Sequence, residues 1–100
     1  MNEYLLSQRA RQELREIWDF IAVDDVDAAD RWIETLIRQF QLLARNPRIG
    51  HERIDLTNRP VLFWPVDKYL IVYRPVGDNV RILAVTQGSR NIPSWLRKRS

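Results

Sequence analysis

Few side chains of this 100-residue chain could carry out acid–base or metal chemistry. His51 is the single histidine, and it stands between Gly50 and Glu52 in a stretch without helix or strand periodicity. An imidazole can serve as a general base at neutral pH. With no cysteine and no second histidine, however, the chain has no recognisable set of zinc ligands. We therefore interpret His51 as an exposed loop residue and not as a catalyst.

Asp24, Asp25 and Asp27 form an acidic cluster that could suggest a metal-binding loop. The spacing of a calcium-binding loop and its distal glutamate are both missing, so a helix cap explains the cluster better. Gly88 is isolated in its segment, which does not support a glycine-rich phosphate loop. The sequence predicts no catalytic residue, metal site, cofactor or small-molecule substrate, and we expect the chain not to be an enzyme.

Arginines in the second half of the chain are the remaining candidates: Arg59, Arg74, Arg81 and Arg90. A guanidinium binds phosphate or carboxylate in a bidentate manner, and neighbouring strand ends could bring some of these side chains together. Trp95 follows them in a basic tail, where it either docks the tail on the domain or awaits a partner. These five residues are the predicted partner-binding site. The alternative is that the arginines only keep a small sheet soluble.

The distribution of charge points to the same half of the chain. Residues 1–50 contain seven arginines and nine acidic residues, a net charge of −2, whereas residues 51–100 contain nine basic and four acidic residues, a net charge of +5. Such a basic half could attract nucleic acid, the ribosome or an acidic protein. The alternative is that 14 arginines against two lysines reflect genome base composition, with a solvated tail.

The composition fits one globular domain spanning 1–100, since 45% of the residues are hydrophobic and 29% are charged. A chain of this length can bury about two-thirds of its surface without a metal or disulfide. We see no signal peptide, and no apolar run approaches the ~20 residues that span a bilayer. We therefore expect a protein that is soluble, without membrane contact, and cytoplasmic.

The first half of the chain predicts a short strand followed by two amphipathic helices. Residues 4–6 are an apolar run, and Ser7 is a good N-cap for a helix from Gln8 onward. Asp27 is the expected N-cap of the second helix, which should end at Asn46-Pro47 because proline disfavours helical conformation in the preceding residue. Apolar residues recur at helical spacing in both segments: Ala10, Leu14, Ile17, Trp18 and Ile21, then Ala29, Trp32, Ile33, Leu36, Phe40 and Leu43.

The second half predicts an antiparallel meander of strands over 60–66, 69–74 and 80–86, joined by short turns at Asp67-Lys68 and at Gly77-Asp78-Asn79. Pro60 and Pro65 remove backbone donors, which favours an edge strand or a bulge for the first run. Residues 93–99 could form one or two helical turns. The expected fold class is α+β: a short N-terminal strand and a helical hairpin packed on a three-stranded meander, with a basic C-terminal tail.

The order of these features resembles that of the RelE/ParE superfamily of bacterial type II toxins, in its ParE-like branch, over about residues 4–92. The resemblance is carried by four segments in particular: Leu6 to Ala10, Asn46 to Gly50, Pro65 to Arg74, and Gly88-Ser89-Arg90. It implies a helical hairpin against a twisted antiparallel sheet. It also implies a toxin that inhibits DNA gyrase by binding, and a cognate antitoxin that neutralises it through an extended or helical C-terminal segment.

The same superfamily contains RelE-like endoribonucleases that cut mRNA in the ribosomal A site, and these are the alternative. This chain keeps the arginine of the Gly-x-Arg motif, Arg90. At the other positions that carry basic or tyrosine side chains in RelE-like nucleases, it has Val61, Phe63, Leu70 and Leu96. In-line cleavage needs positioned groups that transfer protons and stabilise charge, so these apolar residues disfavour ribonuclease activity.

Two positions also depart from the ParE-like pattern. Gln87 replaces a common histidine, and Asn91 replaces the usual acid after the arginine. Both residues keep hydrogen-bonding ability and lose charge, which affects the contacts typical of the family more than the fold. A degenerate binding module without toxicity is the third interpretation.

Overall fold

The computed structural model describes residues 2–98. Its elements follow the predicted order: β1 (Tyr4–Leu6), α1 (Gln8–Ala22), α2 (Val26–Arg45), β2 (Leu62–Val66), β3 (Tyr69–Val76), β4 (Asn79–Gln87) and α3 (Ile92–Lys98). The predicted α+β class is confirmed, and the tail forms a short helix where one or two helical turns were expected. Arg99, which that prediction included, lies outside the described residues.

The four strands form one sheet in the order β1-β4-β3-β2. The antiparallel meander is confirmed for β2, β3 and β4. β1 pairs in parallel with β4, with Leu5 opposite Arg81, so the complete sheet is mixed and not purely antiparallel as expected. A parallel pair needs a long crossover instead of a hairpin, and here the helices and the first two meander strands provide it. β2 is an edge strand, as Pro65 predicts.

The helix starts are set by side-chain caps. The Ser7 hydroxyl oxygen accepts a hydrogen bond from the Ala10 N–H at 3.0 Å, as predicted. For α2 the cap is Asp25, whose carboxylate accepts from the Ala28 N–H at 3.0 Å. The prediction of Asp27 as N-cap is therefore wrong: Asp25 has the extended backbone that a cap requires, and Asp27 already lies in the first helical turn. The helix ends at Arg45 and is capped by Asn46, as expected.

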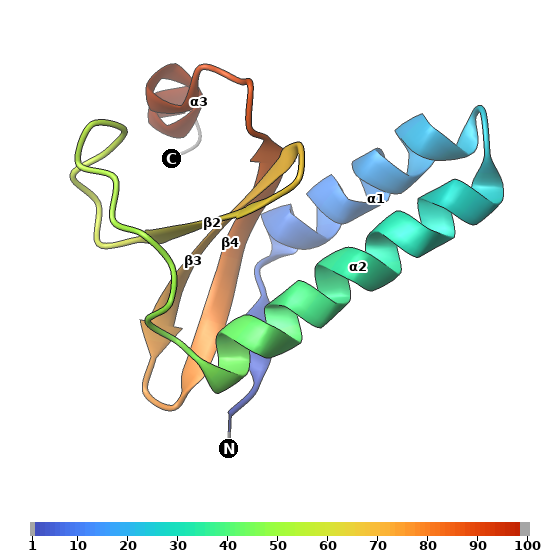
Figure 1. Cartoon of the computed structure of the whole chain (residues 1–100). Coiled ribbons are helices and arrows are strands. Elements are labelled where there is room, and N and C mark those ends of the chain that lie inside the picture. Colours follow the sequence, from blue (N-terminus) through green and yellow to red (C-terminus); the bar gives the residue numbers. More distant parts are fainter. Residues whose placement is uncertain (1, 99–100) are drawn as a thin grey trace.

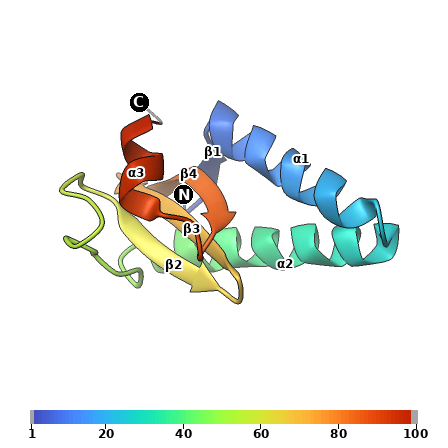
Figure 2. The ribbon, with the colours of Figure 1, turned by 90° about the horizontal axis from the view of Figure 1, so that it is seen from above.

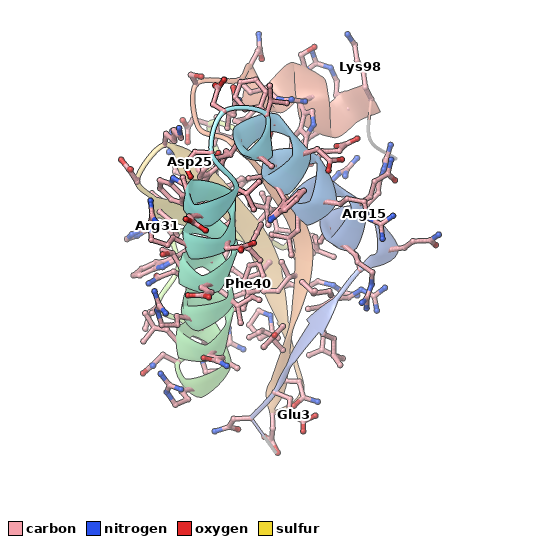
Figure 3. The ribbon with its side chains drawn as sticks, turned by 90° about the vertical axis from the view of Figure 1, so that its right-hand side faces the viewer. Glu3, Arg15, Asp25, Arg31, Phe40 and Lys98 are labelled. Atoms are coloured by element: carbon pink, nitrogen blue, oxygen red, sulfur yellow. The ribbon has the colours of Figure 1, made fainter. Side chains whose placement is uncertain are left out.

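The sheet has a different cover on each face (Figure 1, Figure 2). Side chains alternate along β3, so Ile71 and Tyr73 pack with Phe40 of α2, whereas Leu70 and Val72 pack on the opposite side under α3. Figure 3 labels Phe40 where α2 approaches the strands. The larger core therefore lies between the helical hairpin and the sheet, and a second, smaller core lies beneath α3.

Two tryptophans join the helices to each other and to the sheet, as their positions on the apolar stripes predict. The Trp18 indole N–H donates to the Asp30 carboxylate at 2.8 Å, which links α1 to α2. Trp32 packs edge-on against Tyr69, with ring centroids 5.1 Å apart. The hairpin is thus held in a fixed position relative to the sheet.

Candidate partner-binding surface

An open cleft of about 460 Å³ runs between α1 and α3, across the end of β4. It is lined by side chains of both charges and by apolar groups: Arg9, Gln12, Glu13, Glu16, Ile17, Phe20, Tyr69, Val85, Thr86, Gln87, Arg90, Trp95 and Lys98. An amphipathic lining of this kind fits a segment of another protein better than a compact polar substrate.

The floor of the cleft is the edge of β4 that extends beyond β1. β1 ends at Leu6, opposite Ile82, whereas β4 continues to Gln87, so within residues 2–98 no strand pairs with the last residues of β4 on this side. Side chains of the α1 segment bond to that edge instead. The Glu13 carboxylate accepts from the Val85 N–H at 3.1 Å, and the Ser7 hydroxyl donates to the Leu83 carbonyl at 3.2 Å. These bonds seat α1 against the sheet and fix one wall of the cleft.

The opposite wall is α3, which docks on the second core. Ile92 and Leu96 are buried there, and Trp95 packs against the same cluster. Of the two roles considered for Trp95, docking of the tail on the domain is therefore the one observed. The Arg90 guanidinium lies 5.6 Å from the centre of the Trp95 ring, a cation–π arrangement. The structure thus brings together two of the five predicted site residues, and both face the cleft.

The other three predicted residues lie elsewhere. Arg74 and Arg81 are opposite each other on β3 and β4, both exposed, near the turn that joins these strands. Arg74 lies five positions along β3 from Tyr69 at the cleft end of the strand, a distance of about 17 Å. Arg59 is exposed in the loop before β2. The predicted arginine set is therefore divided: strand ends bring Arg74 and Arg81 together but leave Arg90 at the other end of the sheet.

The contacts of His51 attach its loop to strand β2. Its backbone N–H and carbonyl both bond to Phe63 at 2.8 Å, and its ring stacks on Trp64 with the two planes 19° apart. The Trp64 indole N–H donates to Gln39 of α2 at 2.8 Å. In the described part of the chain, no three histidine or acidic side chains gather closely enough to hold a metal ion.

Tyr69, the first residue of β3, also lines the cleft. Burial raises the pKa of its phenol, and the carboxylate of Asp67 raises it further. The Lys68 ammonium lies 5.7 Å from the ring centres of both Trp32 and Tyr69. The raised pKa keeps the phenol neutral at physiological pH, so Tyr69 adds no charge to the cleft lining.

Sequence reasoning missed the contribution of α1 to this surface. Arg9, Glu16 and Phe20 line the cleft, although only arginines of the second half and Trp95 were predicted to contact a partner. The sequence did contain one signal, because Phe20 is a large aromatic residue that lies off the apolar stripe of its helix. In the structure its side chain is 71% exposed. An aromatic residue outside the buried stripe is a reason to expect an interface.

The fold is that of a small α+β domain in which a helical hairpin and a terminal helix cover opposite faces of one sheet. The family model of the ParE toxin of type II toxin–antitoxin systems, parDE, matches residues 4–92, so the chain belongs to this toxin family. Among solved structures, it is similar to the chromosomal ParDE toxin–antitoxin system of P. aeruginosa. There the TM-score is 0.73 at 17% sequence identity, over 85% of this chain and 94% of that one.

No curated protein is significantly similar to the chain in sequence. Among residues 2–98, no helix combines the length and the apolar character needed to cross a membrane.

Proposed function

We propose that this ParE-family toxin inhibits DNA gyrase by binding it, without chemistry of its own, and that a cognate antitoxin neutralises it. Membership of the toxin family supports the toxin role. The similar fold in a ParDE toxin–antitoxin system is compatible with an antitoxin partner. Both proposed partners are bacterial and cytoplasmic, so the proposal implies the same location for this chain.

One observation supports binding over ribonuclease activity. The four positions at which RelE-like nucleases carry basic or tyrosine side chains are all buried here: Val61 at 8%, Phe63 at 1%, Leu70 at 7% and Leu96 at 5% exposure. They belong to a single apolar cluster that α3 covers. A nuclease needs proton-transferring and charge-stabilising groups exposed at that face, whereas this face is used for packing.

The cleft between α1 and α3 is the proposed antitoxin site. Arg9, Arg90 and Lys98 outnumber Glu13 and Glu16 among its charged side chains, and Phe20 and Trp95 supply apolar contact area. A peptide segment that carries apolar and acidic side chains matches this lining, either as a helix in the groove or as an extended chain.

The proposal is tested with purified toxin in two parallel assays, supercoiling by DNA gyrase and translation of a reporter mRNA on ribosomes. We expect supercoiling to stop and translation to continue, and we expect the neighbouring antitoxin, added in equimolar amount, to restore supercoiling. Arrest of translation with intact supercoiling would support the RelE-like alternative. If expression without the antitoxin leaves growth unchanged, the chain is a non-toxic binding module.

A further inference from the structure

The tip of the helical hairpin carries three exposed apolar side chains within seven residues. Phe20 is 71% exposed, Val23 is 84% exposed and Val26 is 51% exposed. Figures 1 and 2 both place the α1–α2 turn at the end of the hairpin furthest from the sheet, so the hairpin projects beyond the rest of the domain. None of the three side chains belongs to either buried core. Their exposure costs solvation free energy and contributes nothing to the packing.

The tip is a well-defined structure. The N–H groups of Asp24 and Asp25 both donate to the Ile21 carbonyl, at 3.1 and 3.0 Å. The Asp25 carboxylate caps α2, and the hydrogen bond from Trp18 to Asp30 joins the two helices close by. Asp25 is labelled in the turn in Figure 3. A preorganised apolar knob loses little conformational entropy when it is buried by a partner.

The charge around the tip restricts the kind of partner. Residues 19–27 contain four aspartates and no basic residue, in a chain whose net charge is +3. Four carboxylates repel the phosphates of nucleic acid and the anionic surface of a membrane. They attract a protein surface with lysine or arginine side chains around an apolar pocket.

We propose that Phe20, Val23 and Val26 form the anchor by which the toxin binds its target, inserted into an apolar pocket with a basic rim on the target protein. This inference rests on the proposed function, because it assumes a target that binding inhibits. Phe20 also lines the cleft between α1 and α3. An antitoxin segment in that cleft therefore covers one member of the anchor, and target and antitoxin compete for it.

The test compares the double variant Val23→Ser/Val26→Ser with a matched control, Ile54→Ser. Ile54 is 87% exposed in the loop before β2, so the control removes a large exposed apolar side chain away from the tip. Growth arrest on induction, inhibition of gyrase supercoiling, antitoxin affinity and thermal stability are measured for both. We expect the concentration of the double variant that half-inhibits supercoiling to be at least about tenfold higher than that of the wild type. For the control variant, this inhibitory concentration should differ from that of the wild type by less than about twofold. Antitoxin affinity should stay unchanged in both, because Val23 and Val26 do not line the cleft.

Charge reversal gives an independent arm that leaves the apolar side chains in place. Asp19→Lys/Asp24→Lys should weaken toxicity, whereas Asp78→Lys, in the turn at the far end of the sheet, should not. Both sets of residues are exposed, so folding should be unaffected.

The outcomes separate this inference from the proposed function. If the wild type arrests growth without inhibiting gyrase, the proposed target is wrong. The tip inference is then tested by comparing growth arrest by the wild type and by the double variant. If the wild type arrests growth and the double variant does so equally, the tip inference is wrong and the proposed function stands. Loss of antitoxin binding alone, or of self-association in sedimentation experiments, would assign the tip to those partners and overturn the inference. A wild type without any toxicity overturns both.

Discussion

The backbone N–H of Gly50 donates a hydrogen bond of 2.9 Å to the phenol oxygen of Tyr73, at the centre of the sheet. This bond attaches the segment after α2 to strand β3. It also gives the hydroxyl oxygen of Tyr73, a fully buried side chain, a hydrogen-bond donor. The approach is so close that a Cβ on Gly50 would lie 2.6 Å from the same oxygen. The glycine is therefore required by the space that Tyr73 occupies.

Gly50→Ala should destabilise the fold by about 1–3 kcal/mol, because the buried tyrosine ring has no room to move away from the added methyl group. Urea unfolding measures the loss. Gly88→Ala is the matched control, since its Cβ would meet only the Lys68 carbonyl at an ordinary 3.5 Å. Equal unfolding midpoints for the two variants would contradict the steric argument.

Alkaline pH should destabilise the protein through Tyr69 and Tyr73. Burial raises the pKa of both phenols above the ordinary value of 10.0. The folded state therefore holds its protons more tightly than the unfolded chain. This stabilisation is complete below pH 10.0 and is lost as the pH rises toward the raised pKa values, because only the unfolded chain then ionises freely.

The measurement is the free energy of unfolding in urea on either side of pH 10. We expect it to fall with rising pH in the wild type and to fall less steeply in Tyr69→Phe and in Tyr73→Phe. A slope identical in all three proteins would show that other groups control the alkaline transition.

Local patterns predicted most of the elements, because each depends on residues close in sequence. The helical stripes ending before Pro47 and the turns at Asp67 and Gly77 gave helices and hairpins within a few residues of those observed. Asp67 and Gly77 both adopt the left-handed backbone that such turns need, with φ of 54° and 61°. Pairing between distant segments had no local signal, so β1 beside β4 was missed.

The candidate site was only partly predictable for the same reason. Arg74 and Arg81 lie three residues before and four after Gly77, and the hairpin turn there places them opposite each other. The distance between this pair and Arg90 depends on the pairing register of β3 with β4, which the local sequence does not specify. The contribution of α1 depends on how the helix is seated on the edge of β4 that extends beyond β1, which no spacing within α1 specifies.

The cap of α2 gives a prediction about two neighbouring aspartates. Asp25→Ala removes the acceptor for the Ala28 N–H and should cost about 1 kcal/mol of stability. Asp27→Ala removes only a favourable charge in the first turn and should cost about 0.3–1 kcal/mol, a loss that salt reduces. Thermal unfolding at low and high ionic strength separates the two effects. A larger loss in Asp27→Ala than in Asp25→Ala would reverse the assignment of the cap.

The two groups of arginines give a prediction about antitoxin binding. Arg90 lies in the cleft against Trp95, whereas Arg74 and Arg81 lie at the other end of the sheet. If the antitoxin occupies the cleft, Arg90→Ala should weaken its affinity by about tenfold to a hundredfold, as expected for a basic anchor beside an aromatic ring. Arg74→Ala removes the same charge from the chain outside the cleft and should change the affinity by less than about threefold.

Calorimetric titration with the antitoxin at two salt concentrations checks this prediction, because long-range attraction is screened by salt and contact in the cleft is screened less. Both arginines are exposed, so Arg74→Ala should leave thermal stability unchanged, and Arg90→Ala should lower it only by the cation–π contact with Trp95, about 0.5–1 kcal/mol. The decisive comparison is between the two variants at high salt, where only a direct contact still distinguishes them. A greater loss in Arg74→Ala than in Arg90→Ala would move the antitoxin from the cleft to the other end of the sheet, and the competition for Phe20 would then have no structural basis.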